Sequence, residues 1–278
     1  MREILAATLR LRPLVLAGVG VLLLIVFFAV AAPLVAPHDP GALAISSRLK
    51  PPSAEWWFGT DEFGRDIFSR TLYAGRLSLL VGAGVVFISG VIGIVLGLLA
   101  GFFPRLDTIV ARLIDALMAF PDILLAVALV AALGPSLLTV LVALGVVYAP
   151  RLARVVRAST LIIRELPYVE AARALGVPTW RIIGRHVLRN LASPILVQCT
   201  FIFAYAILAE AGLSFLGLGV NPEIPTWGTM IAGGRYYTGQ ADWMTVFPGM
   251  AIILAALSLQ MVGDGLRDLL DPRLGRDL

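Results

Sequence analysis

Long apolar runs separated by polar or basic stretches form the main pattern of this chain. They occupy about residues 14–35, 77–101, 110–133, 137–156, 195–217 and 244–264. An α-helix needs roughly 20 apolar residues to cross a bilayer core of ~30 Å, and each run reaches or approaches that length. The pattern therefore predicts an all-α integral membrane protein with six transmembrane helices.

Composition and charge support this class and indicate an orientation. Hydrophobic residues make up 59% of the chain and charged residues 14%, which excludes an ordinary soluble domain. The net charge is +4, but the arginines concentrate between the apolar runs, so membrane orientation explains them better than nucleic-acid binding. With the basic N-terminus inside, sixteen of the 22 lysine and arginine residues lie on that side and six on the other. Both termini are therefore predicted to be cytoplasmic.

The apolar runs divide the chain into three parts. Residues 1–36 are predicted to form a cytoplasmic segment and the first span, residues 37–75 an extracytoplasmic loop with an interfacial helix at 67–76, and residues 76–278 a domain of five further helices. A cleaved signal peptide is the alternative for the N-terminus, since A-V-A at positions 29–31 resembles a cleavage site. The first run is longer than the ~7–15 residues of a signal core, which favours a retained span.

The second run is rich in small residues. Small side chains let helices approach closely in lipid, where hydrophobic association is absent. We expect a packing seam formed by Gly82, Gly84, Gly90, Gly93, Gly97 and Gly101.

A short helix is predicted in the basic stretch between the fourth and fifth runs, over Tyr168–Gly176. Pro167 suits the first turn of a helix, and Gly176 suits a left-handed cap at its end. About two turns of helix are not stable alone in water, so we expect another element or chain to hold it at the membrane surface. Its charged face has Glu170 and Arg173, and its apolar face has Val169, Ala172 and Leu175.

Two acidic residues lie within the predicted spans. Asp122 follows Pro121, which removes a helix hydrogen bond and is expected to kink the third span. An acid at this depth either lines a watery pathway or is satisfied by backbone groups freed at the kink. Glu210, nearer the outer end of the fifth span, is either a pathway residue or a snorkelling or hydrogen-bonded acid. Asp115 is expected to pair with Arg112, one turn before it.

The chain lacks the residues that most catalytic and cofactor sites need. Lys50 is the only lysine and belongs to no phosphate-binding loop of the G-x-x-x-x-G-K-[ST] type, so any ATPase must be another chain. His38 and His186 lie outside the predicted spans and leave a membrane protease without a base. Cys199 is the only cysteine. These absences argue against a membrane enzyme, and we expect no catalytic, cofactor-binding or metal-binding residues.

The sequence resembles permease subunits of bacterial ABC importers over nearly its whole length. E-A-A at residues 170–172, with Gly176 after three more residues, resembles that family's EAA loop, a coupling helix that docks into a separate ATPase subunit. Further stretches resemble the second, C-type permease of the dipeptide/oligopeptide (peptide/nickel) subfamily: G-T-D-E-F-G-R-D at 59–66, A-E-A-G-L-S-F-L-G-L-G-V at 209–220 with P-T-W-G at 225–228, and G-D-G-L-R-D-L-L-D-P-R at 263–273.

The resemblance implies a permease of the bacterial or archaeal plasma (inner) membrane that carries di- or oligopeptides. Residues 76–278 would be its transmembrane domain. The implied partners are a second permease chain, two ATP-binding subunits or one fused pair, an extracytoplasmic substrate-binding protein and the lipid bilayer, with no nucleic acid. The implied coupling loop between spans 4 and 5 contains Glu170, Ala171, Ala172, Arg173 and Gly176, and the implied cytoplasmic C-terminal motif contains Asp264, Arg267 and Asp271.

One position departs from the family pattern, and two questions stay open. Arg189 replaces the proline expected three residues after His186, so Pro194 becomes the candidate break before the fifth span. Resembling systems also carry nickel chelates, glutathione or oligosaccharides, and the sequence does not choose among these substrates. The alternative function is a stand-alone ion-coupled transporter with Asp122 and Glu210 as relays.

Overall fold

Helices dominate the part of the chain that the structure, a computed structural model, describes, namely residues 13–221 and 223–270. In this part no strand forms, and an isolated bridge joins Thr60 to Asp66. The helices are α2 (Pro13–Val30), α3 (Ala32–Val35), η1 (Ile45–Ser47), α4 (Ile67–Phe102), α5 (Pro104–Met118), α6 (Asp122–Leu133), α7 (Leu137–Ile163), α8 (Pro167–Ala174), α9 (Thr179–Ile182), η2 (Ile183–Val187), η3 (Leu188–Leu191), α10 (Ala192–Phe215), α11 (Trp227–Gly234), η4 (Arg235–Tyr237) and α12 (Trp243–Leu270).

Five helical stretches are long and apolar enough to cross a membrane, and the bent pair α5 and α6 brings the number to six if it counts as one span. The five are α2, α4, α7, the stretch from α9 to the end of α10, and α12. The predicted class, an all-helical membrane protein with about six spans, is thereby confirmed for the described residues.

The predicted third span is not one kinked helix but two helices at 91° to each other. The break is where Pro121 predicts it, because proline has no backbone N–H to donate to the preceding turn. Residues 119–121 leave the helix, and the Leu125 N–H restarts it by donating to the Pro121 carbonyl at 3.1 Å. The position of the predicted kink is therefore correct, but the chain bends more sharply there than in a single kinked helix.

The predicted interfacial helix at 67–76 is the first part of α4, a continuous helix of 36 residues. The proposed boundary between residues 75 and 76 therefore falls inside a helix. Arg70, in the first turn of this helix, is only 5% exposed. Its Nη1 donates to the Pro40 carbonyl at 3.0 Å, so the loop before α4 satisfies a charged group at the start of that helix.

The glycines of α4 form the predicted packing seam, mainly against α7. A Cβ atom built on Gly97 would lie 2.6 Å from Val156 Cβ, and one on Gly93 would lie 2.8 Å from Leu152 Cβ. Only a residue without a side chain fits such an approach. Gly90 is the exception, since a Cβ atom there would meet nothing within 4 Å.

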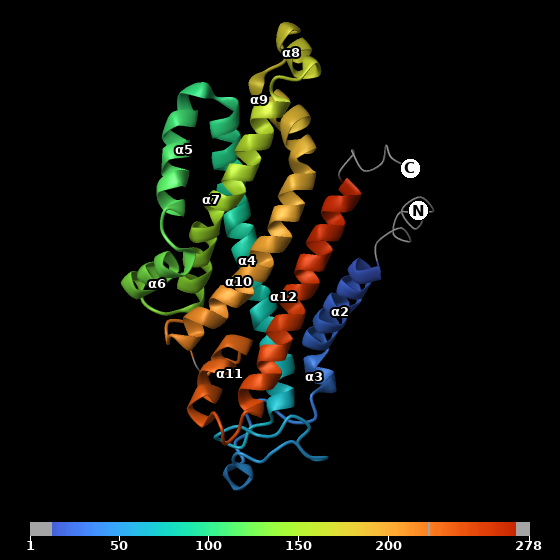
Figure 1. Cartoon of the computed structure of the whole chain (residues 1–278), viewed down its shortest axis with the longest axis vertical. Helices are drawn as coiled ribbons and strands as arrows, with labels where there is room; N and C mark the ends of the chain where they lie inside the picture. Colours follow the sequence, from blue (N-terminus) through green and yellow to red (C-terminus); the bar gives the residue numbers. More distant parts are fainter. Residues whose placement is uncertain (1–12, 222, 271–278) are drawn as a thin grey trace.

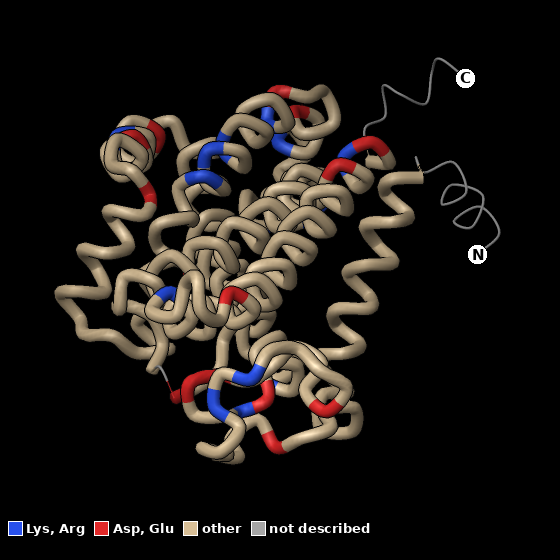
Figure 2. The backbone as a smooth tube through the Cα atoms, turned by 60° about the horizontal axis from the view of Figure 1, so that its bottom comes forward, with Lys and Arg blue, Asp and Glu red and all other residues tan. Residues whose placement is uncertain are grey.

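The long helices run between two ends of the molecule, which we name after the short helices found there (Figure 1). The α8 end holds α8 and the turn between α4 and α5, and both the start of α2 and the end of α12 point toward it. The α11 end holds α11 and residues 36–66. Figure 2 shows that most charged residues gather at these two ends, as expected for spans with an apolar middle.

Candidate functional site

The predicted coupling segment forms α8, which begins at Pro167 and is followed by a glycine in the left-handed conformation. Leu166 is extended before it, and Gly176 has φ +75° after it. The N–H of Gly176 donates to the Arg173 carbonyl at 2.9 Å, and the N–H of Val177 donates to the Ala172 carbonyl at 3.0 Å. These paired bonds are those of a Schellman cap, which needs a residue that tolerates positive φ.

One side of α8 packs against the rest of the chain, and the other is exposed. Val169 is fully buried and Ala172 is 7% exposed. Glu170, Ala171, Arg173 and Gly176 lie on the exposed surface, and the Arg173 guanidinium also lies 5.2 Å from the centre of the Phe102 ring. Of the three residues predicted for the apolar face, Val169 and Ala172 pack inward, whereas Leu175 is 83% exposed where the chain leaves the helix.

The chain does not turn between α8 and the fifth span where the family pattern expects a proline. Residues 179–215 form one helical stretch in which α9, a π-helical segment and a 3-10 segment lead into α10. Arg189 is inside this stretch, and Pro194 falls in the first turn of α10, where a missing N–H costs no helix bond. Neither residue therefore breaks the helix.

Three aspartates of α5 and α6 pair with three arginines of α7. Asp107 accepts from Arg157 at 2.5 and 3.0 Å, Asp115 accepts from Arg154 at 2.9 Å, and Asp122 accepts from Arg151. The expected pair of Asp115 with Arg112 is not formed, because α7 presents arginines at every third residue toward α5 and α6. Asp122 is likewise satisfied by a side chain of α7 rather than by backbone groups freed at the break.

The pair of Asp122 and Arg151 lies far from both ends of α7. Arg151 is about 21 Å from the first residue of that helix and about 18 Å from the last at 1.5 Å per residue. Its guanidinium also lies 5.6 and 5.2 Å from the ring centres of Tyr148 and Tyr205. About a third of each charged side chain is exposed. Charged side chains on a membrane-spanning helix usually face the interior of a bundle or a water-filled cavity.

Glu210 is a buried acid that connects α10 to the start of α11. Its Oε1 accepts hydrogen bonds from Ser214 at 2.8 Å and from Thr226 at 2.9 Å, and the side chain is 1% exposed. Thr226 also caps α11 by accepting from the Thr229 N–H at 3.0 Å. Oε1 is thus hydrogen-bonded inside the fold, whereas Oε2 is buried without a hydrogen-bond partner among the described residues. A Cβ atom on Gly228 would lie 3.1 Å from both carboxylate oxygens, so glycine lets α11 approach Glu210.

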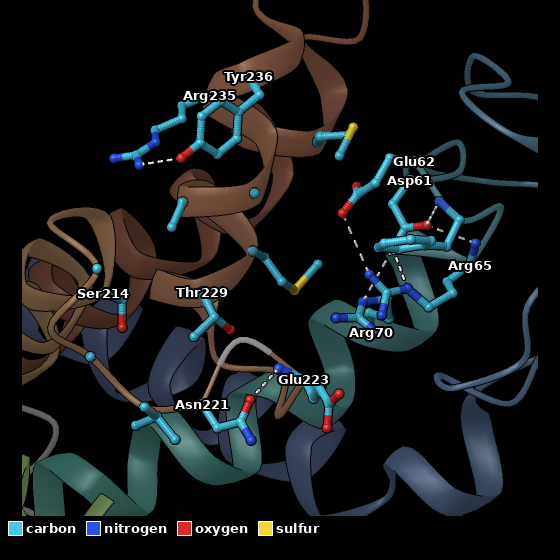
Figure 3. Close-up of a pocket in the computed structure, with 18 of the residues that line it drawn as sticks. Asp61, Glu62, Arg65, Arg70, Ser214, Asn221, Glu223, Thr229, Arg235 and Tyr236 are labelled. Carbon is cyan, nitrogen blue, oxygen red and sulfur yellow. Dashed lines mark hydrogen bonds and ion pairs between the residues drawn. The ribbon is translucent and has the colours of Figure 1, made fainter. Parts of the chain in front are cut away.

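A cavity of about 650 Å³ opens at the α11 end (Figure 3). Residues 61–70 line one side, and residues of the segment 214–236 line the other. Asp61 organises the first side, because its carboxylate accepts from the N–H groups of Phe63 and Arg65 at 2.9 Å and from Arg65 Nε at 2.6 Å. The volume is within the range typical of sites for small ligands.

The C-terminal motif is described only in part. Asp264 and Arg267 are exposed residues of α12, and they form no ion pair with each other despite their helical spacing. Asp271 lies outside the described residues. Within the described part of the chain, no group of three or more histidine, cysteine, aspartate or glutamate residues is arranged to hold a metal ion.

Two features of these sites escape sequence reasoning. The arginines of α7 are visible as a repeat at every third residue, but their aspartate partners depend on how α5 and α6 fold back against α7. The cavity at the α11 end joins residues about 150 positions apart in the chain, and no local pattern indicates which of them meet. The motif stretches at 209–220 and 225–228 did give a signal, since they supply Glu210, Ser214 and Thr226 to one network.

Family comparisons agree with this architecture. Residues 93–276 match the family described as binding-protein-dependent transport system inner membrane component. Residues 5–52 match the N-terminal TM domain of oligopeptide transport permease C.

Similar proteins cover almost the whole chain. A putative peptide transport system permease protein of Brucella suis is 50% identical over 92% of this chain and 87% of its own length. The di/tripeptide transport system permease protein of Pseudomonas aeruginosa is 46% identical, over 93% and 88%. The probable D,D-dipeptide transport system permease protein of Escherichia coli is 42% identical, over 95% and 89%.

The fold is also that of a solved transporter subunit. A chain of the inward-facing MetNI methionine ABC transporter matches with a TM-score of 0.58 and 20% identity, over 70% of this chain and 93% of that chain. These matches argue against the stand-alone ion-coupled alternative and indicate a transport component rather than an enzyme. This chain belongs to the family of binding-protein-dependent transport system inner membrane components, and it is a permease subunit of an ABC importer.

Proposed function

We propose that this chain forms half of a translocation pathway for di- or oligopeptides and that α8 couples it to separate ATPase subunits. The observation that carries the proposal is the family match, together with a short capped helix whose Glu170 and Ala171 face outward at one end of the molecule. The substrate class is inferred from relatives named as peptide permeases. In this proposal the α8 end faces the cytoplasm, as do both termini.

The proposed assembly contains a second permease chain as a heterodimer partner. Two ATP-binding subunits, or one fused pair, bind α8 of this chain and the corresponding helix of the second permease. An extracytoplasmic binding protein delivers peptides at the α11 end. ATP-driven closure of the ATPase pair would push α8 and rock the spans between inward and outward openings. The exposed Leu175 and Trp180 beside α8, at 83% and 70% exposure, are apolar surface that such a partner would cover.

We assign Asp122 and Arg151 to the face that lines the pathway. Their depth along α7 and their partial exposure fit a wet surface and not a lipid-facing one. Glu210 has a different proposed role, because its burial and its bonds to Ser214 and Thr226 suit the support of α11 rather than contact with a solute.

ATP-driven uptake into proteoliposomes tests the proposed function. The complex purified with its partners is reconstituted with ATP inside, with the binding protein and radiolabelled trialanine outside. We expect accumulation that requires ATP and the binding protein and that persists with an ionophore present. Uptake that needs neither ATP nor the binding protein, and that the ionophore abolishes, would contradict the proposal.

A further inference from the structure

We infer that the cavity at the α11 end is a binding site for zwitterionic peptides, in which Arg235 holds the terminal carboxylate and Glu62 the terminal ammonium. The inference rests on the proposed peptide transport and adds a site within this single chain, apart from the face that carries Asp122 and Arg151. Figure 3 shows Arg235 and Glu62 on different sides of the cavity.

Arg235 is a fixed positive charge without an opposing carboxylate among the described residues. It donates hydrogen bonds to the Phe215 carbonyl and to the Tyr236 hydroxyl. Its guanidinium carbon lies 5.0 Å from the Phe215 ring centre and 4.7 Å from the Tyr236 ring centre. Both rings orient the guanidinium without neutralising it. Guanidinium groups held in this way are suited to carboxylates, which they bind through two parallel hydrogen bonds.

Glu62 and Glu223 are the two carboxylates of the cavity that accept no hydrogen bond from the described residues, and Glu62 is the one that lies beside Gly233. Asp61 beside it is occupied by backbone N–H groups and by Arg65. Glu62 accepts no hydrogen bond from the described residues, and its nearest cation is Arg65 Nη2 at 3.7 Å, beyond hydrogen-bond range. The Glu62 carboxylate oxygens are therefore free to accept hydrogen bonds from an ammonium group.

Cavity size and wall chemistry fit a short peptide between these two charges. The volume of about 650 Å³ lies in the range of small-ligand sites, and the lining includes Gly217, Gly219 and Met230 as well as the charged residues. Gly233 also lines the cavity, at a position where a Cβ atom would be 3.9 Å from Glu62 Oε1 and would meet no other atom within 4 Å. The position therefore has room for a Cβ atom, and a larger side chain there would reduce the volume of the cavity.

Equilibrium binding to the complete permease–ATPase complex, without binding protein, tests the site. The probes are radiolabelled trialanine, its C-terminal amide and its N-acetyl form. We expect saturable binding of trialanine and about tenfold weaker binding of each blocked form, as for the loss of one charged hydrogen-bonding partner.

Variants assign the two charges. Arg235→Gln should weaken trialanine binding about tenfold and leave the affinity for the C-terminal amide unchanged. Glu62→Gln should also weaken trialanine binding about tenfold and leave the affinity for the N-acetyl form unchanged. Gly233→Leu should abolish binding of all three probes. Arg48→Gln is the matched control, because Arg48 is an exposed arginine at the same end outside the cavity, and it should change nothing. Equal thermal unfolding midpoints would show that the variants are folded.

Three results would overturn the inference: no saturable binding to the wild-type complex, unchanged trialanine affinity in both charge variants, or full binding in Gly233→Leu. Charge variants that bind trialanine normally but lose uptake when binding protein is present would also overturn it, because Arg235 and Glu62 would then contact that protein. Failure of the proposed function is separate, since it appears as a wild-type complex that accumulates no trialanine with ATP and binding protein.

Discussion

At the scale of single residues, the free space beside the Cα atom decides which glycines of α4 tolerate substitution by a larger residue. Gly97 lies where a Cβ atom would be 2.6 Å from Val156 Cβ and 2.7 Å from the Ala153 carbonyl. A backbone carbonyl and a Cβ atom cannot move without moving the helix that carries them, so α4 and α7 would have to separate. Gly90, in the same helix, has nothing within 4 Å of that position.

Gly97→Ala should therefore destabilise the protein by about 1–3 kcal/mol, the range for overpacked sites. Gly90→Ala should be neutral or slightly stabilising, since alanine is the better helix former. Thermal unfolding midpoints of the two variants in one detergent compare them directly. Equal losses in both variants would contradict the close packing of α4 on α7.

The pair of Asp122 and Arg151 gives a second test at this scale. Arg151→Gln leaves the Asp122 carboxylate without a partner far from the ends of α7, and we expect a loss of about 1–3 kcal/mol, below that of a fully buried pair because both groups are a third exposed. Arg154→Gln breaks the more exposed pair with Asp115 and should cost about 0–1 kcal/mol.

Thermal unfolding midpoints of the purified complex measure both losses. The double variant Asp122→Asn with Arg151→Gln removes both charges and should recover part of the stability. Equal losses of stability in Arg151→Gln and Arg154→Gln would contradict the claim that the pair of Asp122 and Arg151 matters more than the exposed pair of Asp115 and Arg154.

At the scale of elements, α8 has residues that pack against the rest of the chain and residues that face outward, where a partner could bind. Ala172 packs inward and Ala171 faces outward, although the sequence motif treats them as one unit. Their different exposure gives the proposed coupling role a sharp test, because the same substitution should damage folding at one alanine and partner contact at the other.

Ala171→Arg should leave expression and the unfolding midpoint unchanged and reduce ATP-driven trialanine uptake at least tenfold, through a clash with the proposed ATPase cleft. Ala172→Arg should lower expression or the unfolding midpoint, because it forces a charge into a nearly closed contact. Expression, midpoint and proteoliposome uptake are measured for both. Full uptake by Ala171→Arg would contradict the assignment of α8 as the coupling helix.

Elements with strong local patterns could be predicted from the sequence. Apolar length indicated the spans, Pro121 the break between α5 and α6, and Pro167 with Gly176 the bounds of α8. The 91° bend was not predictable, because it depends on where α6 finds a packing surface on α7. Arg70 and Arg151 show the same limit, since only the folded chain reveals that the Pro40 carbonyl accepts from Arg70 and that Asp122 accepts from Arg151.

At the scale of the whole molecule, the two ends differ in the partners that we propose for them. The α8 end holds the proposed coupling helix, and the α11 end holds the cavity with Arg235 and Glu62. This arrangement requires the ends to face opposite sides of the membrane, with the α8 end in the cytoplasm.

Single cysteines test this orientation. In a Cys199→Ser background, Leu43→Cys and Ala171→Cys place one thiol at each end, both at exposed positions. A membrane-impermeant maleimide should label the first in intact spheroplasts and the second only after permeabilisation. The reverse pattern would contradict the orientation, and the Cys199→Ser background alone is the control for labelling of other proteins.

The measurement that tests the central claim most directly is an affinity purification of this chain from native membranes in mild detergent. Mass spectrometry would identify every stoichiometric partner. The account predicts a second multi-span permease and one or two ATPases with phosphate-binding loops, and it predicts that Ala171→Arg removes the ATPases while the second permease stays. Recovery of this chain alone, as a stable homo-oligomer without an ATPase, would contradict it.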